Sequence, residues 1–449
     1  MDDLQIITST SEKFGFKLKD AQIECLCHVL KKEDCMAILP TGYGKSLIYQ
    51  LAPHVLMSKY GLEKSVCLIL TPLNSIMQDQ ILSLQKLGIS ACAVDYTCST
   101  AQTTDSDQDD DDDDGDDDER DCNLLIDVPI ENVSKGGYSL IYAHPEALLS
   151  TKAGEQLLRK FELDNTLSCV AVDEAHMILE WGKDFRTDFT IIGTNLLARF
   201  PEIPVMVFTA TASAEAQSKI AKSLQMKSPN VISRNPDRVN IKYSKIFRPP
   251  SAETQDHLDE ILAPMVDSLI DMRQNYPLTL IYTDTSTISY AYTFFEKKMG
   301  DKQYMGEAIP ENRLFAQYHQ TYTEKMKKFI VSELCKEQSV IRVVFATVAL
   351  GMGLNSPHVR NVIHYKSPTS IEKYFQETGR AGRDGKPSSA TLYYNNTDIR
   401  KNRPGIENSI IHYCKNNSKC MREMMLEHFG HMPSEMVDRS SCCDFCDTL

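Results

Sequence analysis

Short apolar runs of four or five residues recur along the chain, each followed by a turn and a longer stretch with helical periodicity. Runs of this length without polar alternation are typical of parallel strands that are buried on both faces. In the first half they lie at Met36–Leu39, Val66–Leu70, Ser139–Tyr142, Cys169–Val172 and Val205–Phe208. Helical stretches such as Ser46–Met57 and Ser75–Leu87 separate them. The alternation predicts a doubly wound α/β domain that binds ligands at the carboxyl ends of its strands.

A second series follows the polar segment Ser233–Tyr243, whose proline indicates a linker. Its strands are predicted at Leu278–Tyr282, Val343–Ala346, Val362–Tyr365 and Ala390–Tyr393, with helices at Asp256–Asn275 and Ser286–Lys298. The tail from Asn402 has no strand rhythm. We therefore predict a first lobe over residues 1–234, a second lobe over 235–400 and a small helical module over 401–449.

Composition narrows the class of protein. The 449 residues are 42% hydrophobic and 24% charged, which is ordinary for globular proteins. No run of about 18 apolar residues could span a bilayer, and the first residues lack the basic and apolar regions of a secretory signal. Fourteen cysteines in such a chain favour reduced thiols or a metal site over a disulfide framework. We therefore expect an intracellular protein that is not bound to a membrane.

The net charge of −14 is concentrated in one segment, residues 105–121, which contains thirteen acidic residues and one arginine. The rest of the chain is close to neutral, so the acidic balance does not exclude a nucleic-acid partner. The segment has no apolar face to bury and repels itself, which predicts a disordered insertion in the first lobe. It is either a solvated loop without a specific task or a mimic of a phosphate strand that competes for a basic groove.

The segment PTGYGKS follows a predicted strand and opens a predicted helix. Its candidate phosphate-binding residues are Thr41, Gly42, Gly44, Lys45 and Ser46. Glycines let backbone N–H groups surround a phosphate, the lysine can reach the outer phosphates, and the serine can ligate Mg²⁺. The pattern lacks the first glycine of the full P-loop motif, and the alternative is a glycine-containing turn with a solvated lysine.

Asp173 and Glu174 close another predicted strand. A carboxylate at a strand end can hold Mg²⁺, and its neighbour can polarise an attacking water. Adjacent acids also favour the start of a helix, so the pair is weak by itself. Together with the upstream glycine loop, it indicates nucleotide hydrolysis.

Arg380 and Arg383 lie three residues apart in QETGRAGR and are expected to share one helical face. They lie in the second lobe, so they would contact a nucleotide as arginine fingers after domain closure. The alternative is a surface pair that contacts carboxylates.

The segments PTGYGKS, TPLNSIMQDQ, DEAH, TATA, ATVALGMG and QETGRAGRDG occur in the order of superfamily-two helicase motifs. Together with the loop WGKDFR, they make nearly the whole chain, from about Phe14 to Cys446, resemble the RecQ DNA helicases. The resemblance implies an α/β fold with two RecA-like doubly wound parallel-sheet lobes and a small zinc-binding module.

The resemblance also assigns roles to individual residues. Gln22 would read the adenine edge, and Trp181 would lie in an aromatic-rich loop that couples DNA to ATP hydrolysis; the alternative for this single tryptophan is a core position. The residues expected to couple DNA are His176, Trp181, Phe185, Arg186, Thr209, Thr211 and Gln376.

The tail carries a cysteine at the start of a helix and a later cluster, a pattern that fits a tetrahedral Zn²⁺ site in a reduced compartment. The candidate ligands are Cys420, Cys442, Cys443 and Cys446. Cys442 abuts Cys443, so Cys414, His428 and His431 are alternative ligands, and free thiols are the other interpretation.

The resemblance implies an ATP-dependent 3′–5′ DNA helicase or translocase. Its cofactors would be ATP, Mg²⁺ and Zn²⁺, its partners single-stranded and partly duplex DNA, and its location the nucleus or the cytoplasm. DNA repair and recombination are the implied setting. RecQ proteins usually continue into a winged helix, so the sequence ending at Leu449 predicts better translocation than unwinding. Two alternatives stay open, an ATP-gated DNA-binding scaffold and an RNA helicase.

Overall fold

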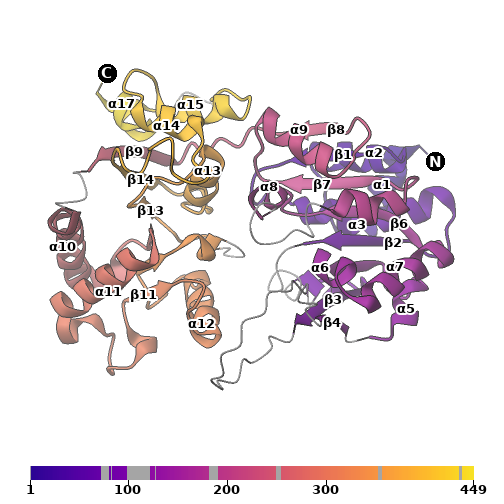
Figure 1. Ribbon diagram of the computed structural model, residues 1–449, viewed down its shortest axis with the longest axis horizontal. Coiled ribbons are helices and arrows are strands. Elements are labelled where there is room, and N and C mark those ends of the chain that lie inside the picture. Colours follow the sequence, from indigo (N-terminus) through magenta and orange to yellow (C-terminus); the bar gives the residue numbers. More distant parts are fainter. Residues whose placement is uncertain are drawn as a thin grey trace, which may run out of the picture. The chain divides into compact units, whose positions relative to one another are not determined.

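The computed structural model describes residues 2–71, 80–81, 83–98, 122–126, 128–181, 191–248, 254–351, 356–433 and 437–448. The chain divides into two compact units, Met1–Arg234 and Asn235–Leu449 (Figure 1). The acidic segment 105–121, Phe185 and Arg186 lie outside the described residues. Of the helix expected at Ser75–Leu87, residues 75–79 and 82 also lie outside them, while residues 80–81 and 83–86 are helical.

The first unit is built on an eight-stranded sheet in the order β4-β3-β5-β2-β6-β7-β1-β8. Its strands are β1 (Cys35–Ile38), β2 (Val66–Leu70), β3 (Ala91–Cys98), β4 (Cys122–Ile126), β5 (Leu140–Ala143), β6 (Leu167–Val172), β7 (Val205–Thr209) and β8 (Asn230–Ser233). All neighbours pair in parallel except β3 and β4, which are antiparallel and flank the acidic segment. The five predicted apolar runs are confirmed as strands, whereas β3, β4 and β8 were not predicted.

Helices cover both faces of this sheet, because the strands are apolar on both sides. The helices are α1 (Asp3–Lys13), α2 (Asp20–Leu30), α3 (Lys45–Tyr60), α5 (Ile130–Ser134), α6 (Pro145–Leu149), α7 (Lys152–Asp164), α8 (Met177–Trp181) and α9 (Ala214–Ser223), with a π turn at Ile192–Leu196. One hydrophobic cluster joins α1, α2 and α3 to the sheet, and a second joins α6, α7 and α9 to its other face.

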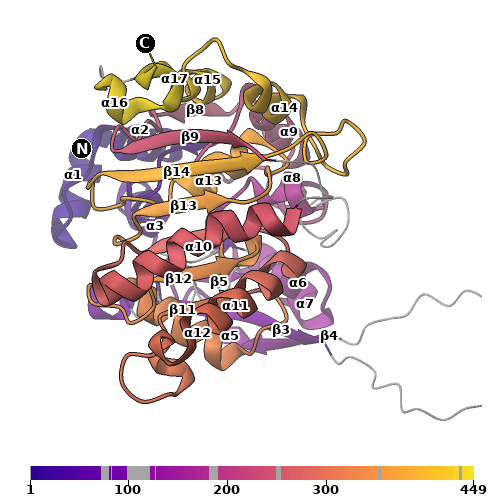
Figure 2. The ribbon, with the colours of Figure 1, turned by 90° about the vertical axis from the view of Figure 1, so that its left-hand side faces the viewer.

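The second unit contains a six-stranded, all-parallel sheet in the order β11-β12-β10-β13-β14-β9. Its strands are β9 (Ile241–Phe247), β10 (Thr279–Tyr282), β11 (Phe315–Tyr318), β12 (Val343–Ala346), β13 (Asn361–His364) and β14 (Ser388–Tyr394). Figure 2 shows α10 (Thr254–Met272) and α11 (Thr285–Met299) in front of one face of this sheet. The remaining helices are α12 (Glu324–Cys335), α13 (Ile371–Thr378), α14 (Asn408–Lys415), α15 (Met421–His428), α16 (Arg439–Cys442) and α17 (Asp444–Asp447). The fold is therefore two parallel-sheet α/β lobes, as the sequence predicts.

The prediction of a linker over Ser233–Tyr243 is wrong at both ends of the segment. Ser233 completes β8, and Ile241 begins β9, which pairs along its whole length with β14. Ile241 and Tyr243 are buried while Lys242 between them is partly exposed, so this is a strand with period-two alternation rather than a continuous apolar run. Only the residues between these two strands connect the units.

The tail is joined to the edge of the second sheet. The Asp444 carboxylate accepts hydrogen bonds from Ser244 Oγ at 2.9 Å and from Lys245 N at 3.0 Å. Lys242 Nζ forms an ion pair with Asp447 at 2.7 Å. Buried tail residues belong to the same hydrophobic cluster as the sheet. The tail therefore covers β9, the strand that would otherwise be an open edge.

Within the described ranges, no helix is long and apolar enough to cross a membrane.

Candidate functional site

The glycine loop lies between β1 and α3, where the chain turns from strand to helix. Gly42 and Gly44 have φ values of +80° and +94°, a backbone conformation that residues other than glycine rarely adopt. A Cβ on Gly44 would lie 2.6 Å from Gln22 Nε2, so this position is closed to larger residues. The loop therefore exposes its backbone at the N-terminus of the 16-residue helix α3, which is favourable for an anion.

Gln22 and Lys19 fix the outer side of this loop. Gln22, which is 2% exposed, donates from Nε2 to Gly44 O at 2.9 Å and accepts from Lys19 N at 2.8 Å. Lys19 Nζ donates to Tyr43 O at 3.1 Å and lies 4.5 Å from the centre of its ring. Gln22 is therefore held against the loop by its own helix.

Lys45 and Ser46 begin α3. Lys45 Nζ donates to Leu39 O at 3.1 Å, so the ammonium folds back over the loop. Ser46 Oγ accepts a hydrogen bond from Gln80 Nε2 at 3.0 Å, and Tyr142 OH donates to Gln80 Oε1 at 3.0 Å. This network fixes the serine hydroxyl beside the start of the helix.

Asp173 follows β6 and is 8% exposed. Tyr49, one helical turn after Ser46, donates from its hydroxyl to Asp173 Oδ2 at 3.1 Å, and Glu174 N donates to Oδ1 at 2.9 Å. Burial, reinforced by the Glu174 carboxylate, raises the pKa of Asp173 to about 6, and the Lys45 ammonium opposes the rise. Two carboxylates and a hydroxyl at a partly buried position are suitable oxygen ligands for a divalent cation.

His176 connects this acidic turn to the end of β7. Its Nδ1 lies 3.4 Å from Glu174 Oε2 and 3.4 Å from Thr209 Oγ1. Thr209 Oγ1 donates to Thr211 O at 3.0 Å. Glu174 itself has φ +49°, an uncommon value for a residue with a side chain. The acidic turn and the TATA segment therefore share one polar network.

The strand order explains why residues far apart in sequence meet here. β6, β7 and β1 are neighbours in the sheet and run in parallel, so their carboxyl ends lie at one edge. Asp173, Thr209 and the glycine loop follow these ends directly. The site combines an anion-binding loop, an ammonium and paired carboxylates, which fits a nucleotide phosphate with Mg²⁺.

Arg380 and Arg383 do not share a helical face, so that prediction is wrong. α13 ends at Thr378, and both arginines lie in turns that follow it. Gly382, between them, has φ +55°, and a Cβ there would overlap Asn240 Nδ2 and Ser388 Oγ. Gly382 N donates to Val359 O at 2.8 Å. Residues 379–383, which follow α13 and contain both arginines, are called the arginine turn below.

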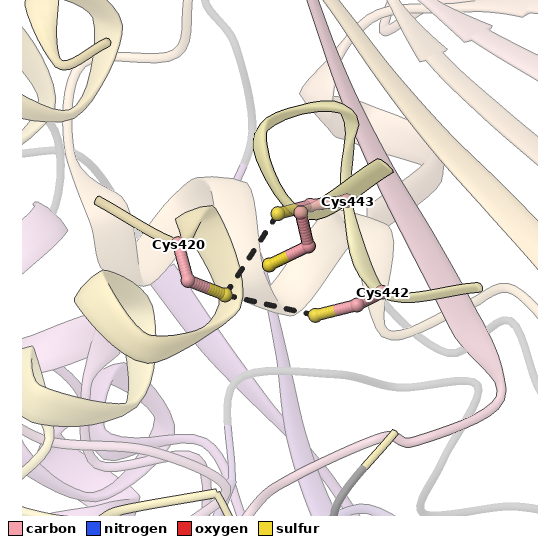
Figure 3. Close-up of side chains that lie close together, drawn as sticks. Cys420, Cys442 and Cys443 are labelled. Atoms are coloured by element: carbon pink, nitrogen blue, oxygen red, sulfur yellow. Dashed lines mark hydrogen bonds between the residues drawn. The ribbon is translucent and has the colours of Figure 1, made fainter. Parts of the chain in front are cut away.

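The four candidate cysteines of the tail come together. Their sulfur atoms lie within 4.8 Å of one another. Cys420 Sγ is 3.6 Å from Cys442 Sγ and 3.8 Å from Cys443 Sγ, and Figure 3 shows these three side chains pointing toward one another. Sulfur ligands 2.3 Å from Zn²⁺ in a tetrahedron are about 3.8 Å apart, so the cluster is suited to zinc. Hydrogen bonding with Cys420 and Cys442 holds the pKa of the Cys443 thiol well below its usual range.

The alternative zinc ligands have other neighbours. Cys414 Sγ lies 3.6 Å from Ser367 Oγ, and His428 Nε2 lies 2.7 Å from the Glu372 carboxylate. In the described part of the chain, the sulfur cluster contains neither of them, nor His431.

Three family profiles match the chain in succession. DEAD/DEAH box helicase matches residues 19–220, helicase conserved C-terminal domain 261–385, and RecQ zinc-binding 395–447. A putative ATP-dependent DNA helicase Q1 of Caenorhabditis elegans is 30% identical over 442 residues, which cover 96% of this chain and 61% of the relative. ATP-dependent DNA helicase Q1 of Rattus norvegicus is 31% identical over 443 residues, covering 96% of this chain and 62% of that protein. The chain belongs to the RecQ family. It spans about three fifths of the length of these RecQ relatives.

Solved structures agree on the fold. The helicase MrfA bound to DNA superimposes with a TM-score of 0.61 at 16% identity, covering 96% of this chain and 55% of that one. Mss116p bound to ssRNA and AMP-PNP gives 0.57 at 15% identity, with 88% and 73% covered.

The RecQ motifs are only partly within the described residues. Trp181 is the last residue of α8, and Gln376 is partly buried on α13. Sequence reasoning missed Tyr49, although its position one turn after Ser46 on the same helix face is a usable signal. It also missed Arg238, which contacts the arginine turn from about 140 residues away and carries no local signal.

Proposed function

We propose that this chain is an ATP-dependent DNA helicase that moves 3′ to 5′ along single-stranded DNA and separates partly duplex DNA. The observation that carries the proposal is the meeting of the glycine loop, Asp173 and Thr209 at the ends of three neighbouring strands. The names of the Q1 relatives support ATP and DNA as the substrates. Nuclear DNA repair and recombination are the setting that fits such an activity.

In this proposal, Lys45 and the backbone at Gly42 and Gly44 hold the phosphates of ATP, while Gln22 contacts the adenine edge. Ser46 and Asp173 hold Mg²⁺. When bound, Mg²⁺ neutralises charge on the outer phosphates. Glu174 orients and deprotonates the attacking water, and its contact with His176 connects this step to Thr209.

Arg380 and Arg383 stabilise the charge that develops on the transferred phosphoryl group. Their guanidinium groups can donate several hydrogen bonds in a fixed geometry, which suits the oxygens of a phosphoryl group. In the second unit they are carried by a turn rather than by a helix, so their position depends on what holds the turn.

The residues Trp181, Phe185, Arg186, Thr211 and Gln376 are proposed to couple DNA to hydrolysis. We expect Trp181→Ala to keep the basal ATPase, because the glycine loop and acidic turn are unchanged, and to lose most stimulation by single-stranded DNA. ATPase rates with and without DNA measure this. Loss of folding by circular dichroism would instead assign Trp181 to the core.

Cys420, Cys442, Cys443 and Cys446 are proposed to bind one structural Zn²⁺. The distances between their sulfur atoms fit this ion. A small helical module buries little apolar surface by itself, so bound metal would contribute directly to its stability.

The deciding experiment measures ATPase activity with single-stranded DNA, single-stranded RNA or neither, followed by displacement of strands from duplexes with a 3′ or a 5′ tail. We expect DNA stimulation and preference for the 3′ tail. Lys45→Ala is the control for contaminating activity. Stimulation by RNA alone would indicate an RNA helicase, and DNA-stimulated ATPase without strand displacement would indicate a translocase or an ATP-gated scaffold.

A further inference from the structure

The short segment that leads into β9, residues 237–241, contacts both the arginine turn and Arg422 of the tail. Arg238, within it, donates from Nη1 to Gly379 O at 3.1 Å. Its Nη2 donates to Ala381 O at 3.0 Å and to Gly382 O at 2.6 Å. One guanidinium therefore binds the backbone on both sides of Arg380 and directly before Arg383.

Asn240 holds the same turn from a second direction. Its Nδ2 donates to Gly382 O at 2.8 Å and to Lys386 O at 2.8 Å. Since α13 has ended at Thr378, the carbonyls of the arginine turn do not belong to a helical hydrogen-bond ladder. Side chains from the segment before β9 donate to the carbonyls of Gly379, Ala381 and Gly382, and Gly382 O also accepts from Gly385 N at 2.9 Å.

Arg422 holds that segment in turn. Its side chain is 2% exposed and forms an ion pair with Asp237 at 2.8 Å. It also donates from Nη1 to Arg238 O at 2.8 Å and from Nη2 to Ile241 O at 2.6 Å, and its guanidinium lies 5.3 Å from the centre of the Tyr243 ring. Arg422 therefore holds the Asp237 side chain and the backbone carbonyls of Arg238 and Ile241.

The helix that carries Arg422 starts at the cysteine cluster. Cys420 is the residue before α15, and Arg422 is the second residue of that helix. The backbone of Cys443 forms an isolated β-bridge with that of Tyr243 in β9, and the Asp444 carboxylate accepts hydrogen bonds from the same strand. A continuous set of contacts thus runs from the cysteine cluster through Arg422 and Arg238 to the arginine turn.

We propose that Arg238 is a positioning residue for ATP hydrolysis, which holds the arginine turn in place, and that Arg422 positions Arg238. The inference rests on the proposed role of Arg380 and Arg383 as the groups that stabilise the transition state. Its physical basis is the planar guanidinium fork, which binds several carbonyls at fixed angles and which a lysine cannot reproduce. A displacement of about 1 Å at a catalytic group can cost on the order of 100-fold in rate.

The first test compares Arg238→Ala and Arg238→Lys with the matched control Arg248→Ala. Arg248 is also a buried arginine of this unit, paired with Asp398 at 2.8 Å and lying 4.7 Å from the Tyr365 ring. We expect Arg238→Ala to lower kcat for DNA-stimulated ATP hydrolysis by about 10- to 100-fold with little change in the KM for ATP. Arg238→Lys should recover only part of kcat. Arg248→Ala should lower the melting temperature while the folded fraction keeps its kcat.

A double-mutant cycle with Arg383→Ala separates positioning from general destabilisation. If Arg238 acts through the turn, Arg238→Ala costs much less in the Arg383→Ala background than in the parental protein. Parental kcat in Arg238→Ala, or losses that multiply in the double mutant, would overturn the inference while leaving the proposed function intact. Full activity in Arg383→Ala would remove the finger role and this inference together.

Arg422→Gln tests the next contact. We expect a fall in kcat that is smaller than that of Arg238→Ala, and little further loss when the two changes are combined. Rates are normalised to the fraction of protein that binds ATP, so partial unfolding does not imitate the effect. A normalised kcat equal to that of the parental protein would remove Arg422 from the proposal.

Discussion

In the two units, the candidate site residues lie at opposite ends of the parallel strands. In the first unit, the glycine loop, Asp173 and Thr209 follow the carboxyl ends of β1, β6 and β7. In the second unit, the arginine turn lies beside residues that precede strands, since Gly382 contacts Val359, before β13, and Asn240, before β9. The candidate phosphate-binding residues therefore lie at the carboxyl ends of their strands, whereas the candidate arginines lie near the amino ends of theirs.

This difference changes what holds each site together. The glycine loop is set by the strand and helix on either side of it, with Gln22 close by in sequence. The arginine turn is held by Arg238, which lies about 140 residues earlier in the chain. Arg238 is in turn held by Arg422, which lies 184 residues after it. The first site is locally determined, and the second depends on distant parts of the chain.

The largest expected effect tests the local site. Lys45→Ala should abolish ATP hydrolysis, because the loop loses its ammonium, while the free energy of unfolding changes by only about 1 kcal/mol for one lost hydrogen bond. Steady-state ATPase and thermal melting measure the two quantities. Hydrolysis near the parental rate in well-folded Lys45→Ala would refute the site.

Arg383→Ala should lower turnover by about 10³-fold, as expected for an arginine finger, while ATP binding by the first unit is retained. Turnover and equilibrium binding of a fluorescent ATP analogue measure this. A loss of turnover below tenfold would favour the interpretation of Arg383 as a surface residue that contacts carboxylates. A loss of ATP affinity as large as the loss of turnover would show that the arginine also contributes to ATP binding.

Cys446→Ser should lower zinc content from about one ion per chain and reduce Tm by roughly 5 °C or more, because each kcal/mol lost from a domain of ~200 residues shifts Tm by about 2–4 °C. Metal analysis and calorimetry under reducing conditions measure this, with Cys335→Ser, an exposed cysteine, as the control. Metal-free parental protein of equal stability would exclude the zinc site. ATP affinity should not change, since the glycine loop belongs to the other unit.

The smallest effect is expected from deletion of residues 105–121. The ATPase rate at saturating DNA should be unchanged. We also expect an unchanged dissociation constant for single-stranded DNA, because at physiological salt the acidic residues are screened from a DNA-binding groove that lies more than a Debye length of about 8 Å away. Binding titrations from low to high salt test this. Tighter binding at low salt that fades as salt rises would establish the phosphate-mimic interpretation instead.

Strands that are encoded by short, uninterrupted apolar runs could be predicted from the sequence. Val66–Leu70 and Val343–Ala346 coincide with β2 and β12 because a strand buried on both faces needs an apolar run. The edge strand β9 was missed since Lys242 and Ser244 alternate with its buried residues. The helical face predicted for Arg380 and Arg383 failed because Gly379 ends the helix before them.

Contacts between distant residues were beyond the sequence patterns. Nothing near Arg238 distinguishes it from a solvated arginine, since its partners are carbonyls that every residue possesses. The cysteine cluster was predictable, because thiol ligands are rare residue types whose grouping is visible. Which of the neighbouring Cys442 and Cys443 would join the cluster required the backbone, which brings both sulfur atoms close to Cys420.

The covering of β9 by residues 443–447 has a consequence for synthesis on the ribosome. β9 is the first strand of its unit, yet its partners Asp444 and Asp447 are translated about 200 residues later. At 5–20 residues per second, the strand would wait about 10–40 s for them. During that interval its backbone edge and the apolar residues beneath the tail are exposed. The nascent second unit therefore cannot complete this edge until residues 444–447 have been synthesised.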